Sequence, residues 1–295
     1  MPVLFASLGA LLLAASPPPL VVAADGILCD LIRTLAGGQA RVVCLIPAGA
    51  DPHTFSLRPS DRRNLAQARL VFINGYDLSP SLKRIKAAGP VVAVAEKAVP
   101  RNPAGDPHLW HDPSNIVAMT HVVSSNLQGL PGSASKGDVQ RRRTAAQAVL
   151  KDLSAWSRRQ IQTVPQKQRV LVSQHKAFST FTGAYGIRER PVIDDYTTGG
   201  LLRPGSLSTI SGEIKASESK ASFAEASPPS KTLRRISRSS GVPIASNPLY
   251  ADGLAPNRSL IQTATGNVCT FVNAQGGRCD TTGAKALQQR WAAIR

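Results

Sequence analysis

Short apolar runs alternate with helical segments along the chain, and this alternation limits the fold more than any other feature. Strand-like runs occur at residues 20–24, 41–46, 70–73, 91–95 and 169–173, with weaker runs at 221–225 and 242–245. Helical patterns lie between and after them, at residues 27–36, 64–68, 115–127, 177–185, 207–216, 230–239, 260–273 and 283–293. Such repeats are typical of parallel sheets flanked by helices, in which ligands bind beyond the carboxyl ends of the strands. We therefore predict an α/β fold.

A long amphipathic segment lies near the midpoint of the chain. From about Asp138 to Thr163, apolar side chains recur at steps of three and four residues, and arginine and lysine occupy the other face. Pro165 ends the pattern. A helix of this length at this place could join two lobes.

The N-terminal segment, residues 1–16, reads as a secretory signal peptide. Its apolar core is too short to span a bilayer comfortably, and no later apolar run reaches the roughly 18 residues that a membrane helix needs. Lys and Arg are missing after Met1, which departs from the usual signal. We favour cleavage after Ser16, because cleavage after Ala23 would remove the first strand. The sequence therefore predicts export to a periplasm.

The chain is strongly basic, with 35 Lys and Arg against 18 Asp and Glu and a formal net charge of +17. Such a charge is common in proteins that bind nucleic acid or anionic membranes. Here the basic residues are dispersed, no nucleic-acid motif is recognised, and export removes the chain from nucleic acid. We predict solvated helix faces and no nucleic-acid partner. A basic adhesin remains an alternative that rests on charge alone.

Four cysteines in an exported chain predict disulfides, since no CxxC spacing suggests a zinc thiolate site. Four cysteines allow three pairings. The local choices are Cys29 with Cys44 and Cys269 with Cys279.

Three of the five histidines and one aspartate follow strand-like runs, where ligand sites of α/β proteins lie. These candidates are His53, His108, His175 and Asp252. Three imidazoles and a carboxylate form a ligand set that suits tetrahedral Zn²⁺. Their separations are too wide for spacing alone to establish that they meet. His111 and His121 are weaker candidates, because one precedes a helix start and the other lies inside a helix.

Three further acidic residues have structural interpretations. Asp112 precedes a helix and is expected to cap it, and Asp51 is expected to stabilise a turn. Glu225 could orient a metal-binding histidine.

Ordered motifs along nearly all of the mature chain carry a resemblance to a known family. They are Pro52-His53-Thr54-Phe55, Pro59-Ser60-Asp61, Asn74-Gly75, the run from Asp106 to Pro113, His175-Lys176-Ala177-Phe178, Ala184-Tyr185-Gly186, Phe223-Ala224-Glu225 and Ala251-Asp252-Gly253-Leu254. In this order they resemble the zinc- and manganese-binding solute proteins of ABC transporters.

The resemblance implies two α/β lobes, each with a small parallel sheet flanked by helices, joined by one long rigid helix. The corresponding boundaries are 1–16 for the signal peptide, 17–135 for the first lobe, 136–164 for the linking helix and 165–295 for the second lobe. It also implies that His53 and His108 from the first lobe, with His175 and Asp252 from the second, bind one divalent metal ion. A monomer that delivers this ion to a membrane permease, without catalysis, is expected.

The third ligand position indicates the metal. Manganese-binding members resemble one another in having glutamate there, and zinc-binding members in having histidine, which His175 matches. Imidazole suits Zn²⁺ and carboxylate oxygen suits Mn²⁺. We therefore predict Zn²⁺, with Mn²⁺ also possible. The chain departs from the family in lacking a histidine-rich loop at 96–105 and glutamates near Ser79 and at 196–200, which leaves docking to the permease open.

An enzyme is the alternative from a different class. In a zinc hydrolase, water would hold one ligand position and Glu225 would act as the base. A fourth protein ligand, Asp252, argues against it because it would close the site.

Overall fold

The computed structural model describes residues 17–130, 135–198 and 206–295. The predicted signal peptide, residues 1–16, lies outside the described residues. Within the described part of the chain, no helix is long and apolar enough to cross a membrane.

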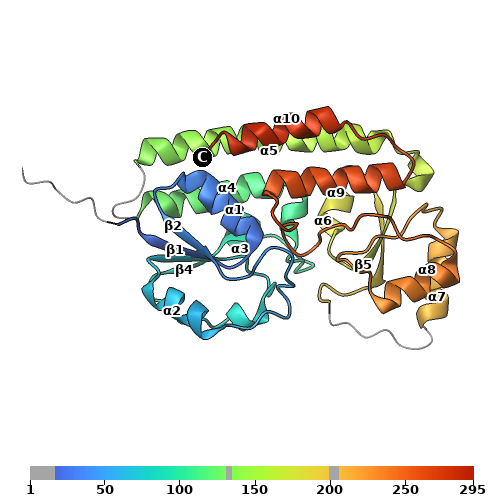
Figure 1. Ribbon diagram of the computed structural model, residues 1–295, viewed down its shortest axis with the longest axis horizontal. Coiled ribbons are helices and arrows are strands. Elements are labelled where there is room, and N and C mark those ends of the chain that lie inside the picture. Colours follow the sequence, from blue (N-terminus) through green and yellow to red (C-terminus); the bar gives the residue numbers. More distant parts are fainter. Residues whose placement is uncertain (1–16, 131–134, 199–205) are drawn as a thin grey trace, which may run out of the picture.

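The first lobe is built on a four-stranded parallel sheet in the order β2-β1-β3-β4 (Figure 1). Its strands are β1 (Leu20–Ala23), β2 (Arg41–Cys44), β3 (Leu70–Ile73) and β4 (Val91–Ala93). Its helices are α1 (Gly26–Ala36), α2 (Pro59–Gln67), α3 (Val94–Ala98) and α4 (Pro113–Gln128), with short 3-10 turns η1 (Pro80–Leu82) and η2 (Leu109–His111). The central strand β1 is buried along its whole length, as expected for a strand covered by helices on both faces. The predicted α/β class is confirmed.

The second sheet is smaller, with β5 (Val170–His175) paired in parallel to β6 (Arg188–Ile193). Single parallel bridges extend it from Val172 to Ser222 and from Ser222 to Ile244. The strands predicted at 221–225 and 242–245 are therefore reduced to one paired residue each. Strand β6 was not predicted from the sequence, because the charged residues and Pro191 of this segment are not typical of a strand. Proline is tolerated there since β6 lies at a sheet edge.

A layer of helices runs across both sheets (Figure 1). The long helix α5 (Lys136–Gln162) packs against α1, α4, α9 (Leu260–Ala274) and α10 (Thr281–Ala292). The remaining elements of the second lobe are η3 (Gln166–Gln168), α6 (Ser179–Tyr185), α7 (Ser206–Ala216) and α8 (Lys231–Ser240). One hydrophobic core runs continuously from Val21 in β1 through Leu150 in α5 to Phe271 in α9. The apolar face of α5 therefore stabilises both lobes at once.

Two disulfides join elements that are neighbours in sequence. Cys29 in α1 pairs with Cys44 in β2, and Cys269 in α9 pairs with Cys279 just before α10. Both local pairings proposed from the sequence are confirmed.

Asp30 in α1 connects the end of the chain to the first lobe. Its Oδ2 accepts hydrogen bonds from the backbone N–H of Leu260 at 3.0 Å and from Nε1 of Trp291 at 2.8 Å. Arg295 forms an ion pair with the same carboxylate. Because Asp30 is buried and its partners belong to α9, α10 and the C-terminal residue, it fixes the C-terminal helices to α1.

Removing the Asp30 carboxylate should therefore destabilise the whole protein. We expect Asp30→Ala to lower the free energy of unfolding by about 3 kcal/mol, because buried donors lose their acceptor. Urea unfolding followed by circular dichroism measures this. Asp152→Ala is the control, since Asp152 pairs with Arg290 at the surface and should contribute less than about 1 kcal/mol. Equal losses in the two variants would contradict the role of Asp30.

Candidate metal centre

Three loops and the end of one strand bring the candidate residues together between the lobes. His53 lies in the loop after β2, and His108 immediately precedes η2 in the loop after α3. His175 is the last residue of β5, and Asp252 lies in the loop that leads to α9. Each lobe therefore supplies two of the four side chains, from the end of the sheet at which α/β proteins bind ligands.

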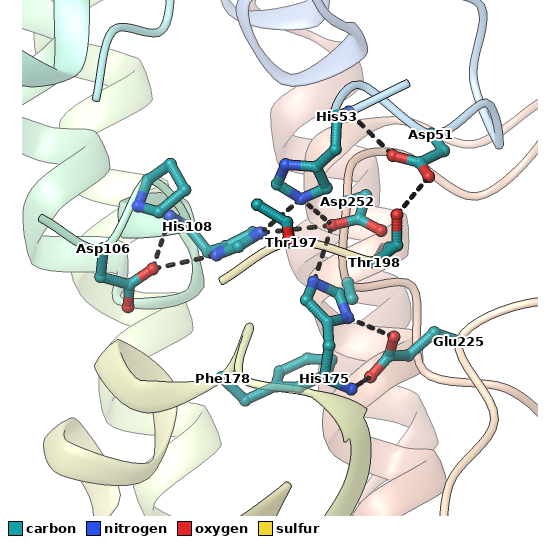
Figure 2. Close-up of polar contacts among 12 residues, drawn as sticks. Asp51, His53, Asp106, His108, His175, Phe178, Thr197, Thr198, Glu225 and Asp252 are labelled. Atoms are coloured by element: carbon teal, nitrogen blue, oxygen red, sulfur yellow. Dashed lines mark hydrogen bonds and ion pairs between the residues drawn. The ribbon is translucent and has the colours of Figure 1, made fainter. Parts of the chain in front are cut away.

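The carboxylate of Asp252 is the centre of this group (Figure 2). Its Oδ1 lies 3.2 Å from Nε2 of His53, 3.2 Å from Nε2 of His108 and 3.3 Å from Nε2 of His175. The Nε2 atoms of His53 and His108 are themselves 3.2 Å apart. One ligand atom from each residue lies within 4.8 Å of all the others, so the group could hold one metal ion.

Carboxylates behind two of the imidazoles fix the orientation of the rings. Nδ1 of His108 lies 2.9 Å from Oδ1 of Asp106, and Nδ1 of His175 lies 2.6 Å from Oε2 of Glu225. In the neutral tautomer that these partners favour, Nδ1–H donates and Nε2 presents its lone pair to the centre. Glu225 also accepts from the backbone N–H groups of Gln174 and His175, at 2.8 and 3.1 Å. This is the orientation that metal-binding histidines require.

The Asp-Pro-His tripeptide forms the same turn at both of its positions. Oδ1 of Asp51 accepts from the backbone N–H of His53 at 2.8 Å, and Oδ1 of Asp106 accepts from that of His108 at 2.9 Å. The expected turn role of Asp51 agrees with this contact. The additional contact of Asp106 with the His108 ring was missed, although its place two residues before a candidate ligand is a signal that could have indicated it.

The interior of the site has an unsatisfied nitrogen. Nε2 of His175 is buried and forms no hydrogen bond of adequate geometry within the described residues, despite its short distance to Asp252. A buried polar atom without a partner is unfavourable unless another group completes it. The nitrogen points toward the other three ligand atoms, where a cation would fit.

Electrostatics favour positive charge at this centre. Burial disfavours a charged His175, but the carboxylates of Asp252 and Glu225 outweigh burial and raise the pKa of His175 to about 10. Burial also disfavours a charged His108, but the carboxylates of Asp106 and Asp252 outweigh burial and raise the pKa of His108. Burial would raise the pKa of Asp252, yet the three imidazoles hold that pKa well below its usual range. The metal-free site therefore keeps protons that a metal ion would have to displace.

The two remaining histidines lie outside the ligand group. Nε2 of His111 donates to the backbone carbonyl of Ala251 at 2.8 Å, and its ring packs against Phe178. Burial lowers the pKa of His111 to about 4, so the ring stays neutral. Sequence reasoning expected only a helix-start role here and missed this contact next to Asp252. His121 is exposed on α4 and contacts Gln147. Asp112 caps α4, as predicted.

A family model described as ZnuA, zinc-uptake complex component A periplasmic, matches residues 21–274. The chain belongs to the ZnuA family. The resemblance predicted from the ordered motifs is thereby confirmed.

Individual relatives agree with this membership. The manganese-binding lipoprotein MntA of Halalkalibacterium halodurans is 28% identical over 269 residues, which cover 86% of this chain and 87% of that protein. The zinc-binding protein TroA of Treponema pallidum is 28% identical over 235 residues, with 76% and 75% covered. The solved structure of the latter matches with a TM-score of 0.81 at 27% identity, over 89% of this chain and 100% of that one. Fe(III)-bound YtgA of Chlamydia trachomatis shares the fold, with a TM-score of 0.80 at 24% identity over 89% and 99%.

Membership of the ZnuA family establishes the general class of activity. Its members are metal-binding solute proteins of ABC transporters and not enzymes. The names of the relatives include both zinc and manganese. Likeness alone therefore does not identify the metal.

The pKa directions lead to a test on the metal-free protein. At pH 8 we expect the His175 ring to carry both protons, because its pKa is raised to about 10, whereas His111 should stay neutral down to pH 5.5, because its pKa is lowered to about 4. Ring-nitrogen chemical shifts from NMR measure both states. In Glu225→Gln the pKa of His175 should fall, since one carboxylate that raises it is gone. A neutral His175 at pH 7 in the unmodified protein would contradict this account.

Proposed function

We propose that this protein captures a divalent transition metal ion, Zn²⁺ in the first place, between its two lobes and delivers it to the permease of an ABC transporter. The ligands are His53, His108, His175 and Asp252. The observation that carries the proposal is the convergence of four ligand atoms from both lobes within 4.8 Å of one another.

The spacing of these atoms supports a small tetrahedral ion. Bonds of about 2.0 to 2.1 Å in a tetrahedron separate neighbouring ligand atoms by roughly 3.3 Å. Oδ1 of Asp252 lies 3.2 to 3.3 Å from Nε2 of each of the three histidines. The remaining pairs of ligand atoms, all within 4.8 Å, would have to approach the same spacing around an ion.

The donor atoms support Zn²⁺ over Mn²⁺. Three imidazole nitrogens and one carboxylate suit Zn²⁺, whereas Mn²⁺ prefers oxygen donors. Zinc-binding and manganese-binding relatives are equally similar to this chain, at 28% identity. The choice of Zn²⁺ therefore rests on His175 and not on the relatives, and a manganese carrier of the same family is the second candidate.

Membership of the family supports the place of action and the partner that we propose. Relatives include the metal ABC transporter substrate-binding lipoprotein SloC of Streptococcus mutans and the manganese ABC transporter substrate-binding lipoprotein PsaA of Streptococcus pneumoniae. We infer that this chain acts as a monomer in a periplasm after removal of residues 1–16. Cell fractionation that found the full-length protein in the cytoplasm would contradict this location.

Replacing His175 should change the metal preference. We expect metal analysis and competitive titration of the purified protein to show tighter binding of Zn²⁺ than of Mn²⁺. His175→Glu should weaken Zn²⁺ binding by about tenfold or more and shift the preference toward Mn²⁺, because a carboxylate replaces an imidazole. His121→Glu is the control, since His121 is exposed on α4 and should leave both affinities unchanged. Predominant Mn²⁺ binding by the unmodified protein would overturn the choice of Zn²⁺.

Zinc binding should release protons at neutral pH. The pKa of His175 is raised to about 10 in the metal-free protein, so its proton must leave before Nε2 can bind the ion. Apparent affinity should therefore rise by about tenfold per pH unit for each proton released as the pH goes from 6 to 8.5. Competition with a chelator measures the affinity, and calorimetry in buffers of different ionisation enthalpy counts the protons. Equal affinity at pH 6 and pH 8.5 would exclude imidazole ligands.

A further inference from the structure

A cleft lies beside the metal centre, between the two lobes. Its volume is about 330 Å³, and its lining includes the carboxylates of Asp51, Glu225 and Asp252. None of the lining residues in the described chain is Lys or Arg, although the whole sequence carries 35 of them. The cleft is therefore an acidic passage in a basic protein, which favours the approach of a cation.

Access to the metal centre runs through this cleft. The Asp252 side chain is 15% exposed, whereas those of His53, His108 and His175 are at most 4% exposed. Asp252 also lines the cleft, and no ligand histidine does. An ion that enters or leaves by this route passes the carboxylate first.

Asp51 bridges the lobes at the wall of the cleft (Figure 2). One carboxylate oxygen accepts from the backbone N–H of His53 at 2.8 Å. The other accepts from the hydroxyl of Thr198, in the second lobe, at 2.6 Å. A single side chain thus connects the backbone of a first-lobe ligand to a loop of the other lobe.

The loop that carries Thr198 is anchored beside another ligand. The backbone N–H of Lys176 donates to the carbonyl of Asp195 at 3.0 Å. Nζ of Lys176 lies 3.0 Å from Oδ1 of Asp194. Because Lys176 directly follows His175, residues 194–198 connect the neighbourhood of His175 to Asp51. This segment spans the gap between the lobes beside the metal centre.

We propose that the Asp51–Thr198 hydrogen bond is a latch that controls the exchange of the metal ion through the acidic cleft. This inference rests on the proposed function. The bond joins the two lobes at the wall of the cleft, so we expect it to oppose opening of the cleft both when an ion enters and when one leaves. Asp51 and Thr198 are thus positioning residues that set exchange rates, and they need not touch the ion. Loosening the latch lowers the barrier in both directions.

Thr198→Val tests the latch, because valine keeps the shape of threonine and removes the hydroxyl. Stopped-flow mixing of the metal-free protein with Zn²⁺ gives the association rate, and mixing of the Zn²⁺-loaded protein with excess chelator gives the dissociation rate. We expect both rates to rise by about five- to tenfold, with the equilibrium affinity changed by less than about threefold, as expected for loss of one hydrogen bond to a charged group. Thr198→Ser should restore both rates.

Thr197→Val is the matched control, because the Thr197 hydroxyl bonds within its own loop to Asp195. Its rates should equal those of the unmodified protein. In an Asp51→Ala background, Thr198→Val should have no further effect. Rates for Thr198→Val that equal those of Thr197→Val would overturn the latch. A large loss of affinity without faster association would also overturn it, since the bond would then belong to the bound state alone.

Hydrogen exchange of the metal-free protein separates this inference from the proposed function. We expect Thr198→Val, but not Thr197→Val, to accelerate exchange at least threefold in peptides that cover residues 49–55. Unchanged exchange there would refute the latch, whatever metal the protein binds. Faster exchange in a protein that binds no Zn²⁺ or Mn²⁺ would support the interlobe bond and refute the carrier function.

Discussion

The convergence of three imidazole nitrogens on one carboxylate oxygen is the interaction on which the rest of the structure depends. Oδ1 of Asp252 lies within 3.3 Å of Nε2 of His53, His108 and His175. Lone pairs directed at one point repel one another unless positive charge lies between them, and burial prevents water from screening that repulsion. The pKa values of His108 and His175 are raised, so we expect protons to supply this charge in the metal-free protein. Metal capture is then an exchange of protons for a cation within a fixed frame.

Such a frame needs two lobes that keep their relative position, and the helix layer holds the lobes in place. The apolar face of α5 lies in a core that includes residues of both lobes, and Asp30 fixes α9 and α10 to α1. Asp252 lies in the loop that leads to α9, and α9 is fixed to α1 of the first lobe. The first lobe therefore helps to position Asp252. Contacts nearer the site, such as those from Asp106, Glu225 and His111, need only orient side chains. Rigidity thus comes from the helices and fine orientation from the loops.

Sequence patterns predicted the α/β class and most of the elements, because buried parallel strands and amphipathic helices have strong periodicities. They failed at β6, where charges and Pro191 occupy an edge strand that needs few apolar residues. The four candidate ligands came from positions after strands together with ordered motifs, but separations of many tens of residues carry no information about convergence. Two contacts could not be predicted from the sequence. The contact of Asp106 with the His108 ring depends on the orientation of that ring. The hydrogen bond between Asp51 and Thr198 depends on how the lobes pack.

A net charge of +17 would be expected to repel the cation that we propose for this site. Distance resolves the conflict. Screening in physiological salt limits surface charges to a range of about 8 Å, whereas the carboxylates of Asp106, Asp252 and Glu225 act at hydrogen-bond distance inside a buried site. The charged residues that line the cleft beside the site are acidic, and no described Lys or Arg lines it, so the charge of the lining has the sign opposite to the net charge of the protein. The basic surface is therefore compatible with the proposed cation carrier.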